Sequence, residues 1–207
     1  MVCSITFKKE GIMPSVFLTS DTHFGHAGVC KFLCADGVTK IRPWTDPNEM
    51  DEEMVKRWND RVGPKDKVYH LGDVVINRKS LSILSRLNGD KVLIKGNHDI
   101  FKLSDYTAHF RDIRSYHVMN GLILSHIPLH LESLYRFGCN IHGHLHQNRV
   151  MRIRADGSPE IDPNYFNVSV EQTDFAPILF EDALKAIKEQ GGQVGFKESA
   201  YGHGLAT

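Results

Sequence analysis

Five short apolar segments of this 207-residue sequence each end in side chains that can bind a metal ion. These side chains are carboxylates, one carboxamide and several imidazoles, with no thiolate among them. Such oxygen and nitrogen donors suit Mn, Fe, Zn, Ni or Mg better than a structural zinc ion held by cysteines. In chain order they are Asp21, His23, Asp73, Asn97, His98, His126, His144 and His146.

Taken singly, most of these motifs carry little information. Asp-x-His at 21–23 and Gly-Asp at 72–73 are common in turns, and a lone histidine such as His126 is more often a buried core residue. Gly-Asn-His-Asp at 96–99 is more specific, because it pairs a neutral oxygen donor with a titratable ring. Gly-His-Leu-His at 143–146 can direct two imidazoles to one side of an extended segment. Their combination, each motif after its own strand, indicates one shared site.

The elements that would position these residues follow from the hydrophobic pattern. Short β-favouring runs precede every motif, and stretches with helical periodicity lie between them, which is typical of an α/β protein. Ligands of open α/β sheets bind at the carboxyl ends of the strands, so the polar loops can converge. The predicted strands are 15–20, 67–71, 91–95, 122–125 and 140–142, and the predicted helices are 27–33, 47–62, 79–87, 131–137 and 181–190.

The remaining segments complete the predicted domain organisation. Turn residues at 155–159 indicate a β-hairpin that pairs 149–154 with 165–170, and 178–180 is a further strand. We expect residues 1–13 to be an N-terminal extension, 14–190 to be one domain, and 191–207 to be a flexible tail.

Composition limits the class of partner. Lys+Arg and Asp+Glu each number 25, so no overall positive field would attract extended nucleic acid, and a small or short substrate fits better. We find no apolar run of the roughly 18 residues needed to cross a membrane. Lys8, Lys9 and Glu10 interrupt the region where a signal peptide would be apolar. A cytoplasmic location is therefore expected.

Together the motifs resemble those of the calcineurin-like metallophosphoesterase superfamily. That series runs Asp-x-His, Gly-Asp, Gly-Asn-His-Asp/Glu, His and Gly-His-x-His, and here it spans residues 21–146. The resemblance implies an α/β fold in which two mixed β-sheets stack face to face, with helices on the outside.

The resemblance also implies a role for each residue. His98 would contact the scissile phosphate and protonate the leaving oxygen, and Asp73 would bridge two divalent metal ions. Mn is the first expectation for both ions, with Fe, Zn, Ni or Mg as alternatives. Two ions about 3.5 to 4 Å apart can activate a bridging hydroxide for in-line attack on phosphorus. One ion would be held by Asp21, His23 and His146, and the other by Asn97, His126 and His144.

The substrate is less constrained than the chemistry. The stretch 72–78 lacks the second Asp of the protein Ser/Thr phosphatases, whereas 20–26 resembles small bacterial and phage predicted phosphoesterases. His26 is a candidate substrate contact or a structural residue at a helix N-terminus, and Arg42 is a candidate phosphate ligand. We expect hydrolysis of a phosphodiester or phosphomonoester in a small nucleotide or oligonucleotide. The alternatives are a nuclease acting on polymeric DNA or RNA and a non-catalytic scaffold, as in the metallophosphoesterase-like subunit of retromer.

Overall fold

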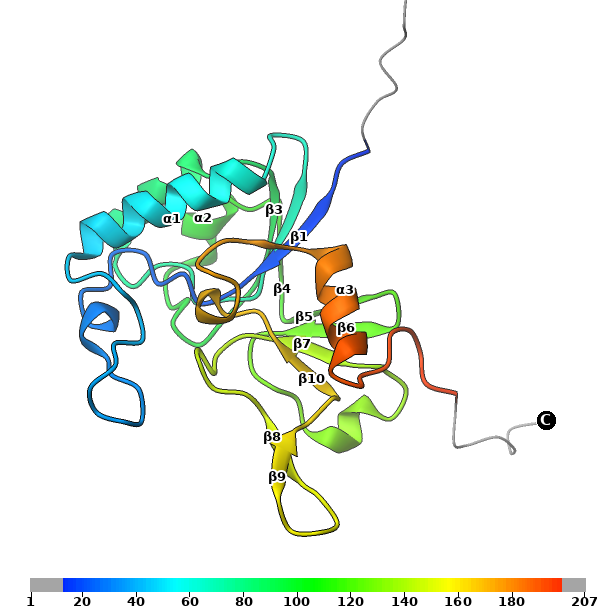
Figure 1. The fold of residues 1–207 in the computed structure, drawn as a ribbon. Helices are drawn as coiled ribbons and strands as arrows, with labels where there is room; N and C mark the ends of the chain where they lie inside the picture. Colours follow the sequence, from blue (N-terminus) through cyan, green and yellow to red (C-terminus); the bar gives the residue numbers. More distant parts are fainter. Residues whose placement is uncertain (1–12, 199–207) are drawn as a thin grey trace, which may run out of the picture.

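The first β-sheet has five strands in the order β11–β1–β2–β3–β4, in a computed structural model that describes residues 13–198 (Figure 1). Strands β1 to β4 run parallel to one another, and β11 is antiparallel to β1, so the sheet is mixed. These strands are β1 (Val16–Thr19), β2 (Lys67–His70), β3 (Asp90–Ile94), β4 (Asp112–Arg114) and β11 (Ile178–Leu179).

The second sheet has four strands in the order β10–β7–β6–β5. Strands β10, β7 and β6 are parallel, and β5 is antiparallel to β6, so this sheet is mixed as well. The prediction of an α/β fold with two mixed sheets is therefore confirmed. These strands are β5 (Tyr116–Met119), β6 (Leu122–Ser125), β7 (Asn140–His142) and β10 (Tyr165–Asn167).

Alternating side chains on the strands build two large cores and a smaller cluster around Ile123, Leu134 and Tyr165. On β1, Phe17 joins the core beneath helix α1 (Pro47–Arg61), whereas its neighbour Leu18 joins the core shared by both sheets. Leu124 of β6 and helix α3 (Phe180–Glu189) complete the core between the sheets. The sheets thus stack face to face, with α1 and the short α2 (Leu103–Thr107) together on the outer side of the first sheet (Figure 1).

Two of the predicted helices are α-helices at nearly the expected bounds. Asp46 caps α1 by accepting a hydrogen bond from the backbone N–H of Asn48, and the first helical residue is Pro47. Within 13–198, no helix is both long enough and apolar enough to cross a membrane.

The other three predicted helices are 3₁₀ segments, and α2 was not predicted. The longest 3₁₀ segment, η2, contains serines that bond to nearby backbone or side-chain oxygens, as the hydroxyl of Ser82 does to the carbonyl of Lys79. Such local bonds compete with regular α-helix formation. The 3₁₀ segments are η1 (Val29–Lys31), η2 (Arg78–Arg86), η3 (Leu131–Leu134) and η4 (Val170–Gln172).

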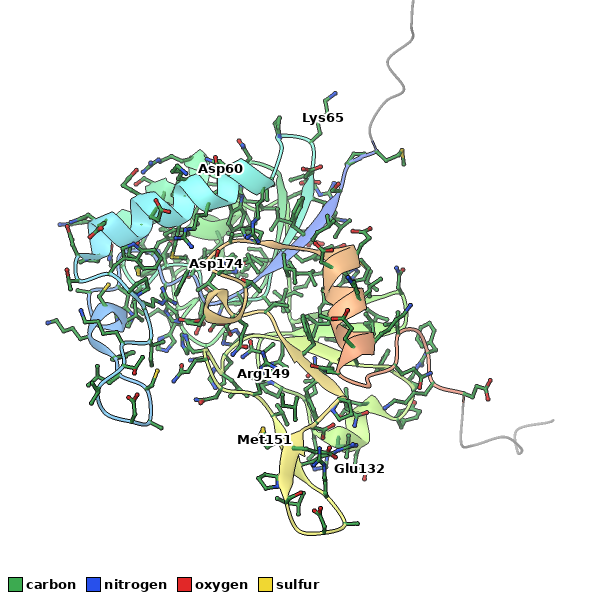
Figure 2. All side chains as sticks on the ribbon, viewed as in Figure 1. Asp60, Lys65, Glu132, Arg149, Met151 and Asp174 are labelled. Atoms are coloured by element: carbon green, nitrogen blue, oxygen red, sulfur yellow. The ribbon has the colours of Figure 1, made fainter. Side chains whose placement is uncertain are left out.

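The hairpin was predicted correctly in its first strand but wrongly in its second. Strand β8 (Met151–Ile153) pairs with β9 (Pro159–Ile161), and β10 instead lies parallel to β7 in the second sheet. The turn closes within 154–158, so the next residues along the chain are the first able to pair. Figure 2 labels Met151 on this projecting hairpin.

Residues 191–198, predicted as the start of a flexible tail, are packed against the domain. The N–H of Lys197 donates to the carbonyl of Arg136, and Phe196 forms a bridge with Phe137. Gly121 permits this approach, because a Cβ there would collide with the backbone of residues 195–196. The rest of the predicted tail, 199–207, and nearly all of the predicted extension 1–13 lie outside the described residues.

Candidate metal centre

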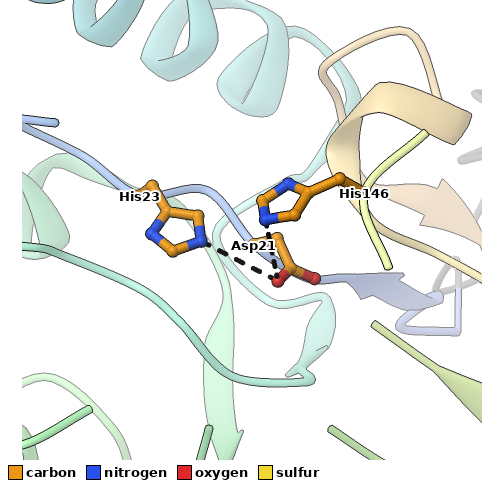
Figure 3. Close-up of side chains that lie close together, drawn as sticks. All are labelled: Asp21, His23 and His146. Carbon is orange, nitrogen blue, oxygen red and sulfur yellow. Dashed lines mark ion pairs between the residues drawn. The ribbon is translucent and has the colours of Figure 1, made fainter. Parts of the chain in front are cut away.

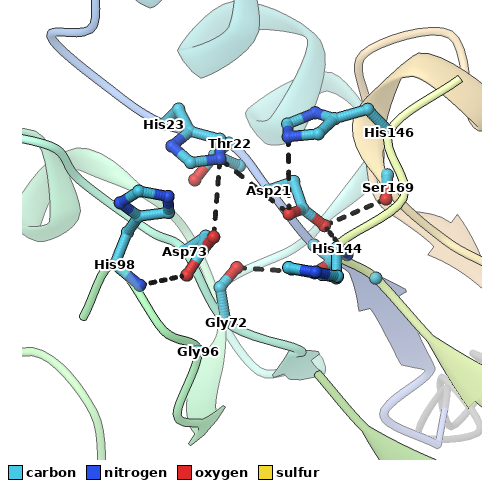
Figure 4. A network of polar contacts seen from close by, with 12 residues as sticks. Asp21, Thr22, His23, Gly72, Asp73, Gly96, His98, His144, His146 and Ser169 are labelled. Carbon is cyan, nitrogen blue, oxygen red and sulfur yellow. Dashed lines mark hydrogen bonds and ion pairs between the residues drawn. The ribbon is translucent and has the colours of Figure 1, made fainter. Parts of the chain in front are cut away.

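The loops that follow β1, β2, β3, β6 and β7 meet at one place and are joined by hydrogen bonds. Figure 4 shows residues of the loops after β1, β2, β3 and β7 at this place. The N–H of Asp21 donates to the carbonyl of Gly72 at 2.9 Å, and the N–H of His23 donates to the carbonyl of Asp73 at 3.0 Å. The N–H of His144 reaches across from the second sheet to Oδ2 of Asp21 at 2.8 Å. Direct hydrogen bonds between the loops therefore hold the site together.

Asp21, His23 and His146 form a first group that could hold a metal ion (Figure 3). Nε2 of His23 lies 3.9 Å and Nε2 of His146 lies 4.0 Å from Oδ1 of Asp21. Oδ1 of Asp21 and both ring nitrogens of His23 are buried without a hydrogen-bond partner among the described residues. Buried polar atoms without partners cost stability, and an ion bound between Oδ1 of Asp21 and Nε2 of His23 would satisfy two of these three atoms.

Asp73, His126 and His144 form a second group of the same kind. Oδ2 of Asp73 lies 3.4 Å from Nε2 of His126 and 3.6 Å from Nε2 of His23, so this carboxylate stands between the two groups. Oδ1 of Asn97 is 2.8 Å from Nε2 of His126. All seven predicted ligands are therefore brought together, in two groups that adjoin at Asp73.

The backbone at the site is strained where ligands are presented. Non-glycine residues rarely adopt a positive φ, and each such residue costs stability. Glycines also keep the loops close, since a Cβ on Gly143 would collide with Ser20 and Asp21. Strain concentrated on ligand positions is typical of a functional site. The left-handed residues are Asp21 (φ 58°), His23 (φ 49°), Asp73 (φ 57°), His144 (φ 69°) and His146 (φ 51°).

The surroundings keep two central ligands in the protonation state that metal binding requires. Burial, reinforced by the Arg42 charge, lowers the pKa of His23 to about 2, so its ring is neutral. Burial alone would raise the pKa of Asp73. The hydrogen bond from His126 and the positive charge of His126 outweigh burial and lower the pKa of Asp73 to about 2. A neutral imidazole and an ionised carboxylate are the forms that coordinate metal ions.

His98 and His26 lie beside the first group. The ring of His98 is exposed, with its centroid 5.4 Å from that of His23, and its backbone N–H donates to Oδ1 of Asp73 at 2.8 Å. The ring of His26 is half-buried, 5.6 Å from His23 and 5.9 Å from Phe32. Both imidazoles therefore border the site.

Arg42 does not lie over the site as predicted for a phosphate ligand. Its side chain is 0% exposed, and its guanidinium lies beneath the first metal-binding loop. Nη2 donates to the carbonyl of Asp21 at 2.6 Å, and Nη1 donates to the carbonyl of Thr22 at 2.8 Å. The guanidinium of Arg42 is bound to backbone carbonyls, so the prediction that it contacts phosphate is wrong.

Glu171, on η4, is a residue of the site that sequence reasoning missed. Its Oε1 lies 3.0 Å from Nδ1 of His146 and accepts a hydrogen bond from Nε of Arg42 at 2.8 Å. Burial alone would raise its pKa, but the charges of Arg42 and His146 lower the pKa of Glu171 to about 2. A buried carboxylate therefore links the arginine beneath Asp21 to the ligand histidine of the other sheet.

One sequence relative settles the family. The chain is 36% identical over 185 residues to the uncharacterized protein MJ1445 of Methanocaldococcus jannaschii, covering 86% of this chain and 93% of that protein. The chain belongs to the MJ1445 family. Gene 66 protein of Mycobacterium phage D29 is 37% identical over 92 residues, covering 42% of this chain and 41% of the phage protein. No family model matches the sequence.

Among solved structures, the protein of unknown function AQ665 from Aquifex aeolicus has a similar fold. It superposes with a TM-score of 0.62 at 24% identity, covering 84% of this chain and 99% of that one. This similarity shows that the two chains share a fold.

Proposed function

We propose that the protein is a phosphoesterase of the calcineurin-like metallophosphoesterase superfamily, with two divalent metal ions as its cofactor. The observation that carries this proposal is the pair of adjoining ligand groups that meet at Asp73. Its substrate would be a phosphodiester or phosphomonoester of a small nucleotide or oligonucleotide.

The donors present fit two divalent ions. Asp73 would be shared, and manganese is the first expectation because carboxylate, carboxamide and imidazole donors all suit it. When bound, such ions supply Lewis acidity toward phosphoryl oxygens and lower the pKa of water. One ion would be held by Asp21, His23 and His146, and the other by Asn97, His126 and His144.

The protein's own groups then bind and protonate the substrate. Asp21 and Asp73 contribute two negative charges against the four positive charges of the ions, and the net positive charge favours an anionic phosphate. His98 would donate a proton from its exposed ring to the leaving oxygen, since its backbone bond to Asp73 keeps the ring beside His23. His26, on another side of His23, is placed to contact the substrate.

Hydrolysis of p-nitrophenyl phosphate and bis-p-nitrophenyl phosphate in Mn²⁺ tests the proposal. We expect turnover by the wild type and a loss of about 10² to 10⁴ in kcat for His98→Ala, the range for loss of a general acid. We expect a loss of Mn²⁺ binding for Asp73→Asn. His109→Ala is the matched control, because His109 bonds to Ser85 and precedes β4, away from the metal-binding loops.

A substrate panel separates the remaining alternatives. It contains 2′,3′-cyclic and 3′,5′-cyclic nucleotides, single-stranded oligonucleotides, a long DNA or RNA, and a phosphopeptide. Preference for the long polymer would favour a nuclease over the proposed substrate class. Failure to hydrolyse any substrate with any common divalent ion would reject catalysis and favour a scaffold.

A further inference from the structure

A groove of about 680 Å³ adjoins the candidate metal centre. Asn97 and His126, both assigned to the second ion, form part of its wall. Any ligand in the groove is therefore next to the position that a metal-held phosphate would take. Its other walls come from the loop after β3, the start of β5, and the loop after β6.

Large apolar side chains line this groove although they are exposed to solvent. Tyr116 is 57% exposed and Ile127 is 50% exposed, and the wall between them includes the buried Ile123 and the half-buried Leu129. Exposed apolar side chains gathered in a hollow beside polar functional groups indicate a ligand-binding surface.

Hydrogen bonds hold the apolar wall in place without a ligand. Oδ1 of Asn140 accepts from the N–H of Leu129 at 2.9 Å, and the hydroxyl of Tyr165 donates to the carbonyl of Leu129 at 2.8 Å. The hydroxyl of Ser125 donates to the carbonyl of Ile127 at 2.7 Å. The loop that carries Ile127 and Leu129 is thus anchored on buried strands, so binding would require little ordering of the wall.

Polar residues of the groove indicate which kind of ligand fits it. Lys95, Ser115 and Ser133, whose side chains carry an ammonium group and two hydroxyls, also line the groove. A purely aliphatic ligand would leave these groups unused. A flat ring with polar atoms on its edge can stack on the phenol of Tyr116 and bond to them.

We propose that this groove binds the aromatic ring of the substrate, a nucleobase or a similar heteroaromatic group joined to the phosphate that the metal centre holds. The assignment rests on the proposed phosphoesterase function for the position of the phosphate. It makes Tyr116 and Ile127 residues that determine specificity.

Binding of phenylphosphonate and methylphosphonate to the Mn²⁺-loaded protein, measured by calorimetry, tests the groove without any turnover. We expect the wild type to bind phenylphosphonate about tenfold more tightly, because stacking of one ring contributes roughly 1–3 kcal/mol. Tyr116→Ala and Ile127→Ala should reduce that preference about fivefold, whereas Tyr116→Phe should retain it. Ile153→Ala is the matched control, since Ile153 is 69% exposed on the β8–β9 hairpin.

An activity measurement extends the test to a nucleobase. Thymidine 5′-p-nitrophenyl phosphate and methyl p-nitrophenyl phosphate share a leaving group, and only the first carries a base. We expect Tyr116→Ala to lower kcat/KM for the thymidine ester alone. Ring preference without turnover of either ester would reject the hydrolytic function but keep the groove as a ring-binding site.

Three results would overturn the groove assignment. The first is equal binding of the two phosphonates by the wild type. The second is a ring preference that survives both alanine substitutions. The third is a wild-type dimer that Ile127→Ala dissociates, which would make the groove an interface between copies of the chain.

Discussion

The buried pair Arg42 and Glu171 orients individual residues among the proposed metal ligands. Arg42 bonds to the carbonyls of Asp21 and Thr22, and so supports the left-handed loop that presents the first carboxylate. Glu171 contacts Nδ1 of His146, which leaves Nε2 directed toward Asp21. A carboxylate on the far nitrogen of a ligand histidine fixes its tautomer and raises its basicity. The pair would therefore position the proposed metal ligands without contacting the substrate.

Replacement of Glu171 by Gln should weaken Mn²⁺ binding by about 10- to 100-fold, the usual effect of losing such a partner. The variant will also be less stable, because Arg42 loses its buried counter-charge. Calorimetric Mn²⁺ titration at a temperature where circular dichroism shows full folding separates these two effects. Glu160→Gln is the control, since Glu160 pairs with Arg152 and Arg154 on the hairpin. Unchanged Mn²⁺ affinity would contradict the positioning role.

At the residue scale, the sequence predicts the proposed ligands but not the residues that support them. The seven expected ligands stand in short motifs directly after strands, and the structure brings them together. Glu171 lies 25 residues beyond His146 in an unremarkable segment, and long-range contacts such as the parallel bridge between Ser20 and Ser169 bring it to the site. Arg42 was expected to bind phosphate, because nothing in its sequence neighbours indicates that its guanidinium bonds to buried backbone carbonyls instead.

At the scale of elements, local pattern predicted the strands that carry ligands but not every pairing. Strands β1, β2, β3, β6 and β7 are apolar runs that end in polar loops, and each was predicted. Strands β4 and β5 are only partly buried and have weak patterns, so both were missed. Strand β10 was assigned to the hairpin, since its partner β7 is distant in sequence and only the common core brings them together.

Substitution of Gly143 by Ala tests how closely the loops of the two sheets must approach. The new methyl group would collide with the side chains of Ser20 and Asp21, so the loop carrying His144 and His146 would have to move. We expect the free energy of unfolding to fall by about 1–3 kcal/mol, as for overpacking in a core, and Mn²⁺ affinity to fall with it. Urea denaturation and Mn²⁺ titration measure the two effects.

The matched control for that change is Gly63→Ala. A Cβ at Gly63 approaches only the carboxylate of Asp66, at 3.2 Å, and the position precedes β2, whereas Asp73 follows the other end of that strand. It should leave Mn²⁺ affinity unchanged. If Gly143→Ala behaved in the same way, the close approach of the loops would not be needed for the site.

At the scale of the whole molecule, each proposed ion would join the two sheets. In the first group, Asp21 and His23 follow β1 of the first sheet, whereas His146 follows β7 of the second. In the second group, Asp73 belongs to the first sheet, and His126 and His144 belong to the second. The sheets already share a core, so the ions would add cross-links at the end where the loops are strained.

Metal binding should therefore stabilise the fold as a whole. An ion present at 100 times its Kd adds about 2.7 kcal/mol per site to the free energy of unfolding. For a chain of this size, two such sites should raise Tm by roughly 10–20 °C. Thermal unfolding with Mn²⁺ and after chelation measures this shift. His146→Ala removes a ligand of the first group only and should lose about half of it, whereas Asp73→Asn alters the shared ligand and should lose most of it. Loss of the shared carboxylate has to weaken both proposed sites. If Mn²⁺ raised Tm equally in the wild type and in both variants, Mn²⁺ would therefore bind elsewhere.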